Sequence, residues 1–443
     1  MTTLVPTPAA PPSGAPIIDR RLDPLRAKVE AGERLSIADG ELLYSTPDIW
    51  TVCELAQLVR DRLHPGVAYF NINRHLNYSN VCALSCKFCE FYRKKDQPGA
   101  YTRDLDYIKA EAIDAVEKGA TEIHIVGGLH PYLPFSYYPE MLAAIREVAP
   151  TLHIKAFTAV ELVHLAKIAK VYKRNDRTAS IRHVLTELKA AGLGSLPGGG
   201  AEVFDDRVHD KAYKGKIRSD EWLDVHTVAH ELGLNSNATI LYGHIDQRRE
   251  RLIHMEILRR AQDKALARLG YEGVASHDEA TGNGLIALDE IDAPAITLTR
   301  DGVDLPKPPE KDSRSAGGYF QTIIPLPFFP DGSELEHLPG PTGLENLRTL
   351  AVARLMLDNF PHVKAFWIMQ TLGMAQLMLQ NGADDIDGTV VWYDITKVGG
   401  ASTHQETTVW DLQKAIREAG YEPVERDTLY RRVVRDGSEW RAE

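Results

Sequence analysis

Short apolar runs alternate along most of the chain with longer runs of helical periodicity. The short runs predict strands at 69–73, 122–126, 153–157, 194–196, 237–241, 320–324, 363–368 and 389–392. The longer runs predict helices, among them 104–118, 138–148, 221–232 and 344–357. Strands joined by helical crossovers predict an α/β fold, and eight of them predict a parallel (β/α) barrel. The loops that follow the strands should then carry the active site.

Two segments depart from this alternation. Residues 1–16 are rich in Pro, Ala and Thr without periodicity, which predicts a disordered tail. Residues 265–318 mix Gly, Pro, Asp and Lys and are too long for an ordinary connection, so we expect an inserted surface loop. The remainder, 17–443, is predicted to be one barrel domain with N- and C-terminal extensions.

The composition of the chain limits the kinds of molecule that the protein is expected to bind. With 443 residues, 44% of them apolar, the chain can bury a large core. No run of about 18 apolar residues and no secretory signal is found, so we expect a cytoplasmic protein without a membrane partner. The net charge of −11 gives no general attraction for nucleic acid. A small-molecule partner is favoured, and local cations would have to hold an anionic one.

Three of the four cysteines, Cys82, Cys86 and Cys89, form a C-x3-C-x2-C run. Three thiolates at this spacing can hold a 4Fe-4S cluster and leave its fourth iron open to a small ligand. Structural zinc usually needs four protein ligands, although His75 could be the fourth. An electron-transfer cluster would need a fourth cysteine, and Cys53 is badly spaced for that role. Cys53 is more typical of a buried small apolar residue.

Other candidates lie at predicted strand ends. Gly127 and Gly128 could form a simple turn or permit close approach of a ligand to the backbone. Gly199 lies within a triple glycine that no Lys-Ser/Thr follows, which argues against a phosphate loop. The polar candidates are His130, Glu161, Glu202, Tyr242 and His244. The histidines could instead be structural, and the acids could be solvated or cap helices.

The cysteine run, with Phe88 directly before Cys89, resembles the signature of radical S-adenosylmethionine (SAM) enzymes. The resemblance implies a radical SAM (β/α) barrel, a 4Fe-4S cluster on the three cysteines, and SAM chelating the open iron. It also implies that the backbone at Gly127 and Gly128 receives the methionine amine. The cofactor would supply the reactive species, while the protein positions and shields it.

Six further segments, 77–82, 126–131, 155–161, 196–202, 241–245 and 324–330, are similar to those of aminofutalosine synthases of the futalosine route to menaquinone. The similarity covers about residues 35–264 and 318–430. It implies that the 5′-deoxyadenosyl radical adds to the vinyl carbon of 3-[(1-carboxyvinyl)oxy]benzoate. Loss of the carboxylate as CO2 or bicarbonate would then give 6-amino-6-deoxyfutalosine. The alternatives are a cyclase like the dehypoxanthine futalosine cyclase, or a non-catalytic iron–sulfur or zinc protein.

The resemblance also suggests roles for the candidates at the strand ends. Catalytic roles are expected for His130, Glu161 and His244. Binding of the cofactor is expected for Phe88, Gly127, Gly128, Glu161, Gly199, Glu202 and Tyr242. The expected partners are a small aromatic enolpyruvyl carboxylate and an electron donor such as flavodoxin or ferredoxin.

Overall fold

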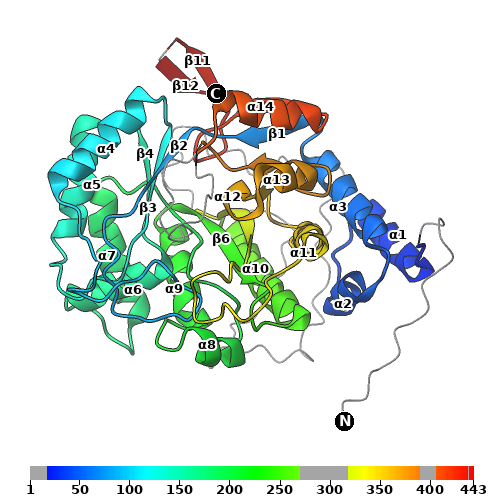
Figure 1. Cartoon of the computed structure of the whole chain (residues 1–443), viewed down its shortest axis with the longest axis horizontal. Coiled ribbons are helices and arrows are strands. Elements are labelled where there is room, and N and C mark those ends of the chain that lie inside the picture. The colour runs from blue at the N-terminus through cyan, green and yellow to red at the C-terminus, as the bar shows by residue number, and fades with distance from the viewer. Residues whose placement is uncertain (1–16, 270–317, 390–405, 438) are drawn as a thin grey trace.

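The computed structural model describes residues 17–269, 318–389, 406–437 and 439–443. Figure 1 shows a central group of strands surrounded by helices, with the separate hairpin β11-β12 projecting beyond α14. The strands are β1 (Val67–Phe70), β2 (Asn73–Leu76), β3 (Glu122–Ile125), β4 (His153–Ala156), β5 (Ser195–Leu196), β6 (Asn235–Tyr242), β7 (Phe320–Pro327), β8 (His362–Ala365), β9 (Asp385–Ile386), β10 (Glu422–Glu425), β11 (Val433–Asp436) and β12 (Glu439–Ala442).

The helices begin with a short 3-10 turn, η1 (Arg20–Leu22). The α-helices are α1 (Asp23–Ala31), α2 (Ile37–Ser45), α3 (Ile49–Leu63), α4 (Leu105–Glu117), α5 (Tyr137–Val148), α6 (Ala159–Ile168), α7 (Arg177–Ala190), α8 (Asp206–Ala212), α9 (Ser219–Glu231), α10 (Arg248–Arg268), α11 (Gly343–Met356), α12 (Trp367–Gln370), α13 (Leu372–Leu379) and α14 (Val409–Glu418).

Ten strands form one parallel sheet in the order β10-β1-β9-β8-β7-β6-β5-β4-β3-β2. β1 and β2 are consecutive in the chain and separated by only two residues, so the sheet curls round and brings β2, at one end, next to β1, near the other end. Counted as one interrupted strand, β1 and β2 complete a ring of eight strand positions with β3 to β9. The predicted eight-stranded α/β barrel is therefore confirmed, and β10 adds to it alongside β1.

The break between β1 and β2 lies where the chain changes its hydrogen-bonding partner. The carbonyl of Phe70 accepts a hydrogen bond from the N–H of Arg426, at 2.9 Å. Two residues later the carbonyl of Ile72 accepts one from the N–H of Thr121, also at 2.9 Å. The single strand predicted at 69–73 was wrong in this respect, because the apolar pattern does not show which neighbour each residue pairs with.

Helix ends follow capping signals in the sequence. Asp104 caps α4 by accepting a hydrogen bond from the N–H of Tyr107, at 2.8 Å. Thr158 and Glu161 form a reciprocal capping box at the start of α6. Apolar faces of the helices pack against the outside of the barrel in one continuous core. The helices predicted at 104–118, 138–148, 221–232 and 344–357 are confirmed as α4, α5, α9 and α11, to within a few residues.

Some expected boundaries differ from the structure. The strand predicted at 363–368 ends at Ala365, because α12 begins at Trp367. The last barrel strand is β9, a few residues before the predicted 389–392, of which 390–392 lie outside the described residues. Part of the expected insertion, 265–268, continues α10, and 270–317 lie outside the described residues, as does the expected tail 1–16. In the described part of the chain, no helix is both long and apolar enough to cross a membrane.

Candidate active site

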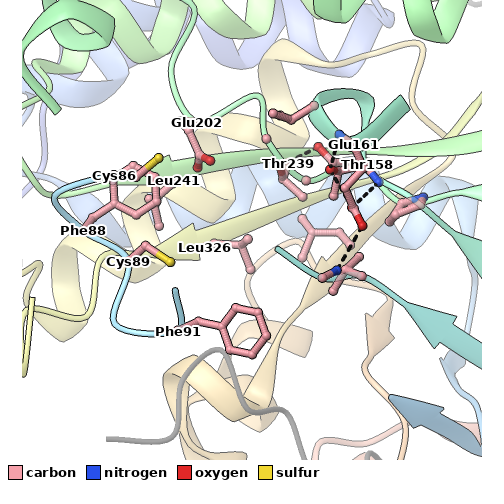
Figure 2. Close-up of a pocket in the computed structure, with 18 of the residues that line it drawn as sticks. Cys86, Phe88, Cys89, Phe91, Thr158, Glu161, Glu202, Thr239, Leu241 and Leu326 are labelled. Carbon is pink, nitrogen blue, oxygen red and sulfur yellow. Dashed lines mark hydrogen bonds between the residues drawn. The ribbon is translucent and has the colours of Figure 1, made fainter. Parts of the chain in front are cut away.

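A cavity lies at the end of the barrel where the parallel strands finish. One wall is the cysteine loop, which we define as residues 80–94 between β2 and α4. Figure 2 shows the sulfur atoms of Cys86 and Cys89 pointing into this cavity, with Thr158 and Glu161 on the other side. The residues predicted to hold a cluster therefore share a cavity with residues from several strand ends, as a barrel active site requires.

The cysteine loop is held by backbone contacts and by one lysine. Lys94 Nζ donates to the carbonyl oxygens of residues 82, 83 and 84, at 3.1, 3.2 and 2.8 Å. Cys82 Sγ accepts hydrogen bonds from the N–H groups of Leu84 and Leu129, both at 3.4 Å. Hydrogen bonds to cluster sulfurs are one of the means by which a protein sets a cluster's reduction potential.

The spacing of the three sulfurs distinguishes a cluster from a single ion. Tetrahedral zinc, with Zn–S bonds near 2.3 Å, places its sulfurs only about 3.8 Å apart. Among the described residues, the one group whose ligand atoms all lie within 4.8 Å of one another is a buried His-His-Asp set elsewhere, not Cys82, Cys86 and Cys89. Burial raises the pKa of Cys86 to about 12, so binding of iron must release protons. The thiol donors and their wider spacing fit a cube better than zinc.

Gly127 and Gly128 pack directly beneath the cysteine loop. A Cβ on Gly127 would lie 2.6 Å from the ring of Tyr78, and one on Gly128 would lie 2.4 Å from the carbonyl oxygen of Val81. The N–H of Gly128 also donates to the carbonyl of Ser79, at 2.7 Å. Both glycines line the cavity, and only residues without a side chain allow β3 to end this close to the loop.

Glu161 is buried at the cavity wall and is satisfied by the protein itself. Its Oε1 accepts from the hydroxyl of Tyr78 at 2.9 Å and from the N–H of Gly127 at 3.0 Å. Its Oε2 accepts from the N–H and the hydroxyl of Thr158, both at 2.8 Å. Burial raises the pKa of Glu161 to about 7 despite these donors. The carboxyl thus ties the glycine pair to α6, and its contact with a cofactor stays a prediction.

Glu202 and Lys216 form a buried ion pair beside the cysteine loop. Glu202 adopts φ +50°, in the left-handed region that non-glycine residues seldom occupy. Lys216 Nζ lies 5.3 Å from the centroid of the Phe88 ring. Burial alone would lower the pKa of Lys216, but Glu202 and Cys86 raise it above its usual value. A permanent cation therefore lies beside the cysteine sulfurs, and nothing in the sequence around Lys216 predicts it.

Three other predicted residues lie outside the lining of this cavity. His130 Nδ1 accepts from the N–H groups at positions 132 and 133, at 3.2 and 3.0 Å. The hydroxyl of Tyr242 donates to Asn346 Oδ1, at 2.9 Å. The His244 ring stacks on that of Phe88, with 6.3 Å between the centroids. These contacts give each residue a structural task, and the predicted catalytic and binding roles stay predictions.

The deepest part of the cavity is polar. We call it the barrel floor and define it by six cavity-lining residues: His75, His124, Lys155, Asn237, Lys364 and Asp387. Gly199 lines the cavity as well. Barrel interiors are usually filled by branched apolar side chains, so charges here are an exception. Of these six residues, only His75 was predicted from the sequence to bind a ligand, as a possible fourth ligand of zinc.

Two family models together match most of the chain. The model of the radical SAM superfamily matches residues 76–255, and the CofH/MqnC C-terminal region matches residues 316–437. Aminodeoxyfutalosine synthase of Thermus thermophilus is 39% identical over 94% of this chain and 97% of its own length. The chain belongs to the aminodeoxyfutalosine synthase family of the radical SAM superfamily.

Other relatives agree with this membership. Aminodeoxyfutalosine synthase of Streptomyces coelicolor is 37% identical over 92% of both chains. Cyclic dehypoxanthine futalosine synthase of the same organism is 30% identical over 93% of this chain and 89% of its own. Among solved structures, methylornithine synthase aligns with TM-score 0.61 at 15% identity, covering 90% of this chain and 97% of its own, which shows the shared fold.

The family confirms that the chain is a radical SAM enzyme that uses a 4Fe-4S cluster and SAM. The structure fits both groups. Three thiols open onto one cavity, and the side-chain-free edge at Gly127 and Gly128 lines the same cavity beside the cysteine loop. The zinc and non-catalytic alternatives therefore lose their support.

Proposed function

We propose that this enzyme joins the 5′-deoxyadenosyl group of SAM to 3-[(1-carboxyvinyl)oxy]benzoate to form 6-amino-6-deoxyfutalosine. The observation that carries the proposal is the 39% identity to an aminodeoxyfutalosine synthase over nearly the whole of both chains. SAM bound to the reduced cluster supplies the adenosyl group as a carbon radical. Overall, SAM, the benzoate and water give the product, methionine, bicarbonate and a proton, and the electron is returned.

The residues around the cavity have distinct tasks in this proposal. Cys82, Cys86 and Cys89 hold three irons, and Lys94 keeps their loop in place through its three carbonyl contacts. Glu161 fixes the glycine pair against α6, so that the backbone edge presented to the methionine amine is rigid. The cysteine loop and the strand ends surround the cavity and exclude water from the radical.

Further residues are proposed to contact the adenosyl group or substrate. Phe88, Gly199 and Glu202 line the cavity and are placed to contact the bound groups directly. Tyr242, His244 and His130 lie outside the cavity lining and would act by positioning. The electron donor is proposed to be a flavodoxin or ferredoxin, and the place of action the cytoplasm, where the thiols stay reduced.

Product analysis tests the proposal. The protein is reconstituted anaerobically with iron and sulfide, reduced with dithionite, and given SAM with the enolpyruvyl benzoate. We expect 6-amino-6-deoxyfutalosine and methionine in equal amounts, and no adduct when the benzoate is omitted. Release of 5′-deoxyadenosine with the benzoate unchanged would contradict the proposed reaction. Turnover of dehypoxanthine futalosine instead would favour the cyclase.

A further inference from the structure

The barrel floor holds two buried lysines on opposite sides of the ring of strands. Lys155 lies on β4 in the sequence His-Ile-Lys-Ala, and Lys364 lies on β8 in His-Val-Lys-Ala. β4 and β8 are four positions apart in the eight-position ring. Both side chains line the cavity. Buried ion pairs contribute little net stability, so two such lysines in a barrel interior call for a functional explanation.

Each lysine has N–H donors that its partners among the described residues do not use. Lys155 Nζ pairs with Glu122 Oε1 at 2.5 Å. Lys364 Nζ lies 3.3 Å from Asp387 Oδ1 and 3.8 Å from Asp385 Oδ2, of which only the first is a hydrogen bond. An ammonium group has three N–H donors. Within the described part of the chain, these contacts leave N–H groups on both lysines for a ligand in the cavity.

His124 adds a neutral donor or acceptor to the same floor. Its ring lies 4.5 Å from that of His75, centroid to centroid. Its Nε2 is buried and forms no hydrogen bond with any described residue. Burial lowers the pKa of His124 well below its ordinary value, so the imidazole is uncharged near neutral pH. An unpaired buried polar atom costs free energy, which a ligand group that bonds to it would recover.

The walls between the barrel floor and the cysteine loop include apolar side chains on β6 and β7. Along β6 the cavity-lining side chains are Asn237, Thr239 and Leu241, in order from the floor towards the strand end. Four residues of strand span about 13 Å. On β7 the corresponding wall is formed by Ile324 and Leu326. A floor that offers ammonium N–H donors, below apolar side chains, is complementary to an aromatic ring that carries a carboxylate at one end.

Burial lowers the pKa of Lys155, and Lys364 lowers it further. Glu122 and Asp387 raise this pKa, so these carboxylates only partly offset the repulsion between the two ammonium groups. A carboxylate between them would relieve this repulsion and make charge-assisted hydrogen bonds. The carboxylate that leaves during the reaction is unsuited to this place, because two cations would oppose its loss. The ring carboxylate of the benzoate is retained in the product and suits it.

We propose that Lys155 and Lys364 bind the ring carboxylate of the aromatic substrate and direct its vinyl ether towards the cysteine loop. This inference rests on the proposed function for the identity of the substrate. The barrel floor would then select substrates whose ring carries a carboxylate, and it would orient the carbon that reacts. The lysines are specificity-determining residues that contact the substrate at the end remote from the bond being formed.

Binding of two unreactive ethers tests the inference without turnover. Calorimetry on the reconstituted enzyme with SAM compares 3-(carboxymethoxy)benzoate with phenoxyacetate, which lacks the ring carboxylate. We expect the wild type to bind the first at least about 100-fold more tightly, in line with two charge-assisted hydrogen bonds. Equal affinities would overturn the inference whatever the variants do.

Variants in which a lysine and its acidic partner are both made neutral test which residues cause the preference for the carboxylated ether. Lys155→Met is combined with Glu122→Gln, and Lys364→Met with Asp387→Asn, so that no buried carboxylate is left unpaired. Each pair should weaken binding of the carboxybenzoate about 10- to 100-fold and change binding of phenoxyacetate less than about 3-fold. Glu122→Gln alone is the control and should keep the preference. If the variants weakened binding of both ligands equally, the lysines would have only a structural role, and the inference would be contradicted.

The binding measurements distinguish a failure of this inference from a failure of the proposed function. If the wild type forms no adduct but prefers the carboxylated ether, the reaction assignment fails and the carboxylate site stands. If the adduct forms without that preference, the reaction stands and the carboxylate site is wrong.

Discussion

The cysteine loop and the barrel floor face each other across one cavity but are built by different means. The loop is an irregular segment whose shape depends on backbone contacts, on Lys94 and on the glycine pair beneath it. The floor consists of side chains on regular strands, and its charges are balanced within the barrel by Glu122 and Asp387. The loop should therefore be sensitive to backbone changes, whereas the floor should respond to changes of charge.

Removing a cluster ligand should give the largest effect. Replacing Cys82, Cys86 or Cys89 with Ala leaves the cluster without one of its three protein ligands, so iron content should fall to background and turnover by at least about 1000-fold. Iron analysis and product formation measure the two quantities. Substantial activity in any of these variants would exclude the cysteine loop as the site of the chemistry.

Gly128→Ala tests whether the loop depends on its backbone support. The added Cβ would lie 2.4 Å from the Val81 carbonyl oxygen, so loop and strand must move apart. We expect turnover to fall about 10-fold or more, and the free energy of unfolding to fall by about 1–3 kcal/mol. Gly373→Ala in α13 is the control, since no atom lies within 4 Å of its Cβ. Normal turnover in Gly128→Ala would show that the loop tolerates displacement.

Glu161→Gln tests the link between the glycine pair and α6. The pKa of Glu161 is about 7 in the folded protein, against an ordinary value of 4.5, so the folded state binds the proton more tightly than the unfolded state. Its contribution to stability is therefore full below pH 4.5 and is lost as pH rises through 7, by up to about 3 kcal/mol. The variant should lose this slope in urea unfolding between pH 5 and pH 8. Glu140→Gln on the exposed face of α5 should keep it, and an unchanged slope in Glu161→Gln would contradict the assignment.

Cys53→Ala should have the smallest effect. Cys53 is buried in α3, where burial raises the pKa of its thiol to about 11. Its loss removes one packed sulfur atom and should lower the free energy of unfolding by about 1 kcal/mol. Iron content and turnover should be unchanged, which makes this variant the matched control for the three cluster cysteines. Loss of iron would mean that Cys53 is a fourth ligand.

The two regions also differ in how far the sequence predicts them. The alternation of strands and helices predicted the barrel, and the C-x3-C-x2-C run predicted the cluster site, because both depend on local spacing. Lys94 and Lys216 could not be identified, since each looks like an ordinary surface lysine in its own segment. Their roles arise from contacts between segments that a single sequence does not show.

The barrel floor did leave a signal that was not used. Lys155 and Lys364 each lie within a short apolar run that predicts a strand. A charge in such a run is unusual unless it is paired, so the repeated His-Ile/Val-Lys-Ala pattern marks an inward-facing polar site. Conversely, His130, Tyr242 and His244 were chosen for their position at strand ends. Their place outside the cavity lining depends on side-chain direction, which the pattern does not give.

One labelling measurement tests the central claim most directly. The reduced enzyme is given the enolpyruvyl benzoate and SAM carrying ¹³C at the 5′ carbon of the adenosyl group, and the products are analysed by mass spectrometry. The proposed addition predicts that the label appears in a product containing both the benzoate and the adenosyl group. If the label appears only in 5′-deoxyadenosine while the benzoate is consumed, the enzyme abstracts hydrogen instead, and the account is contradicted.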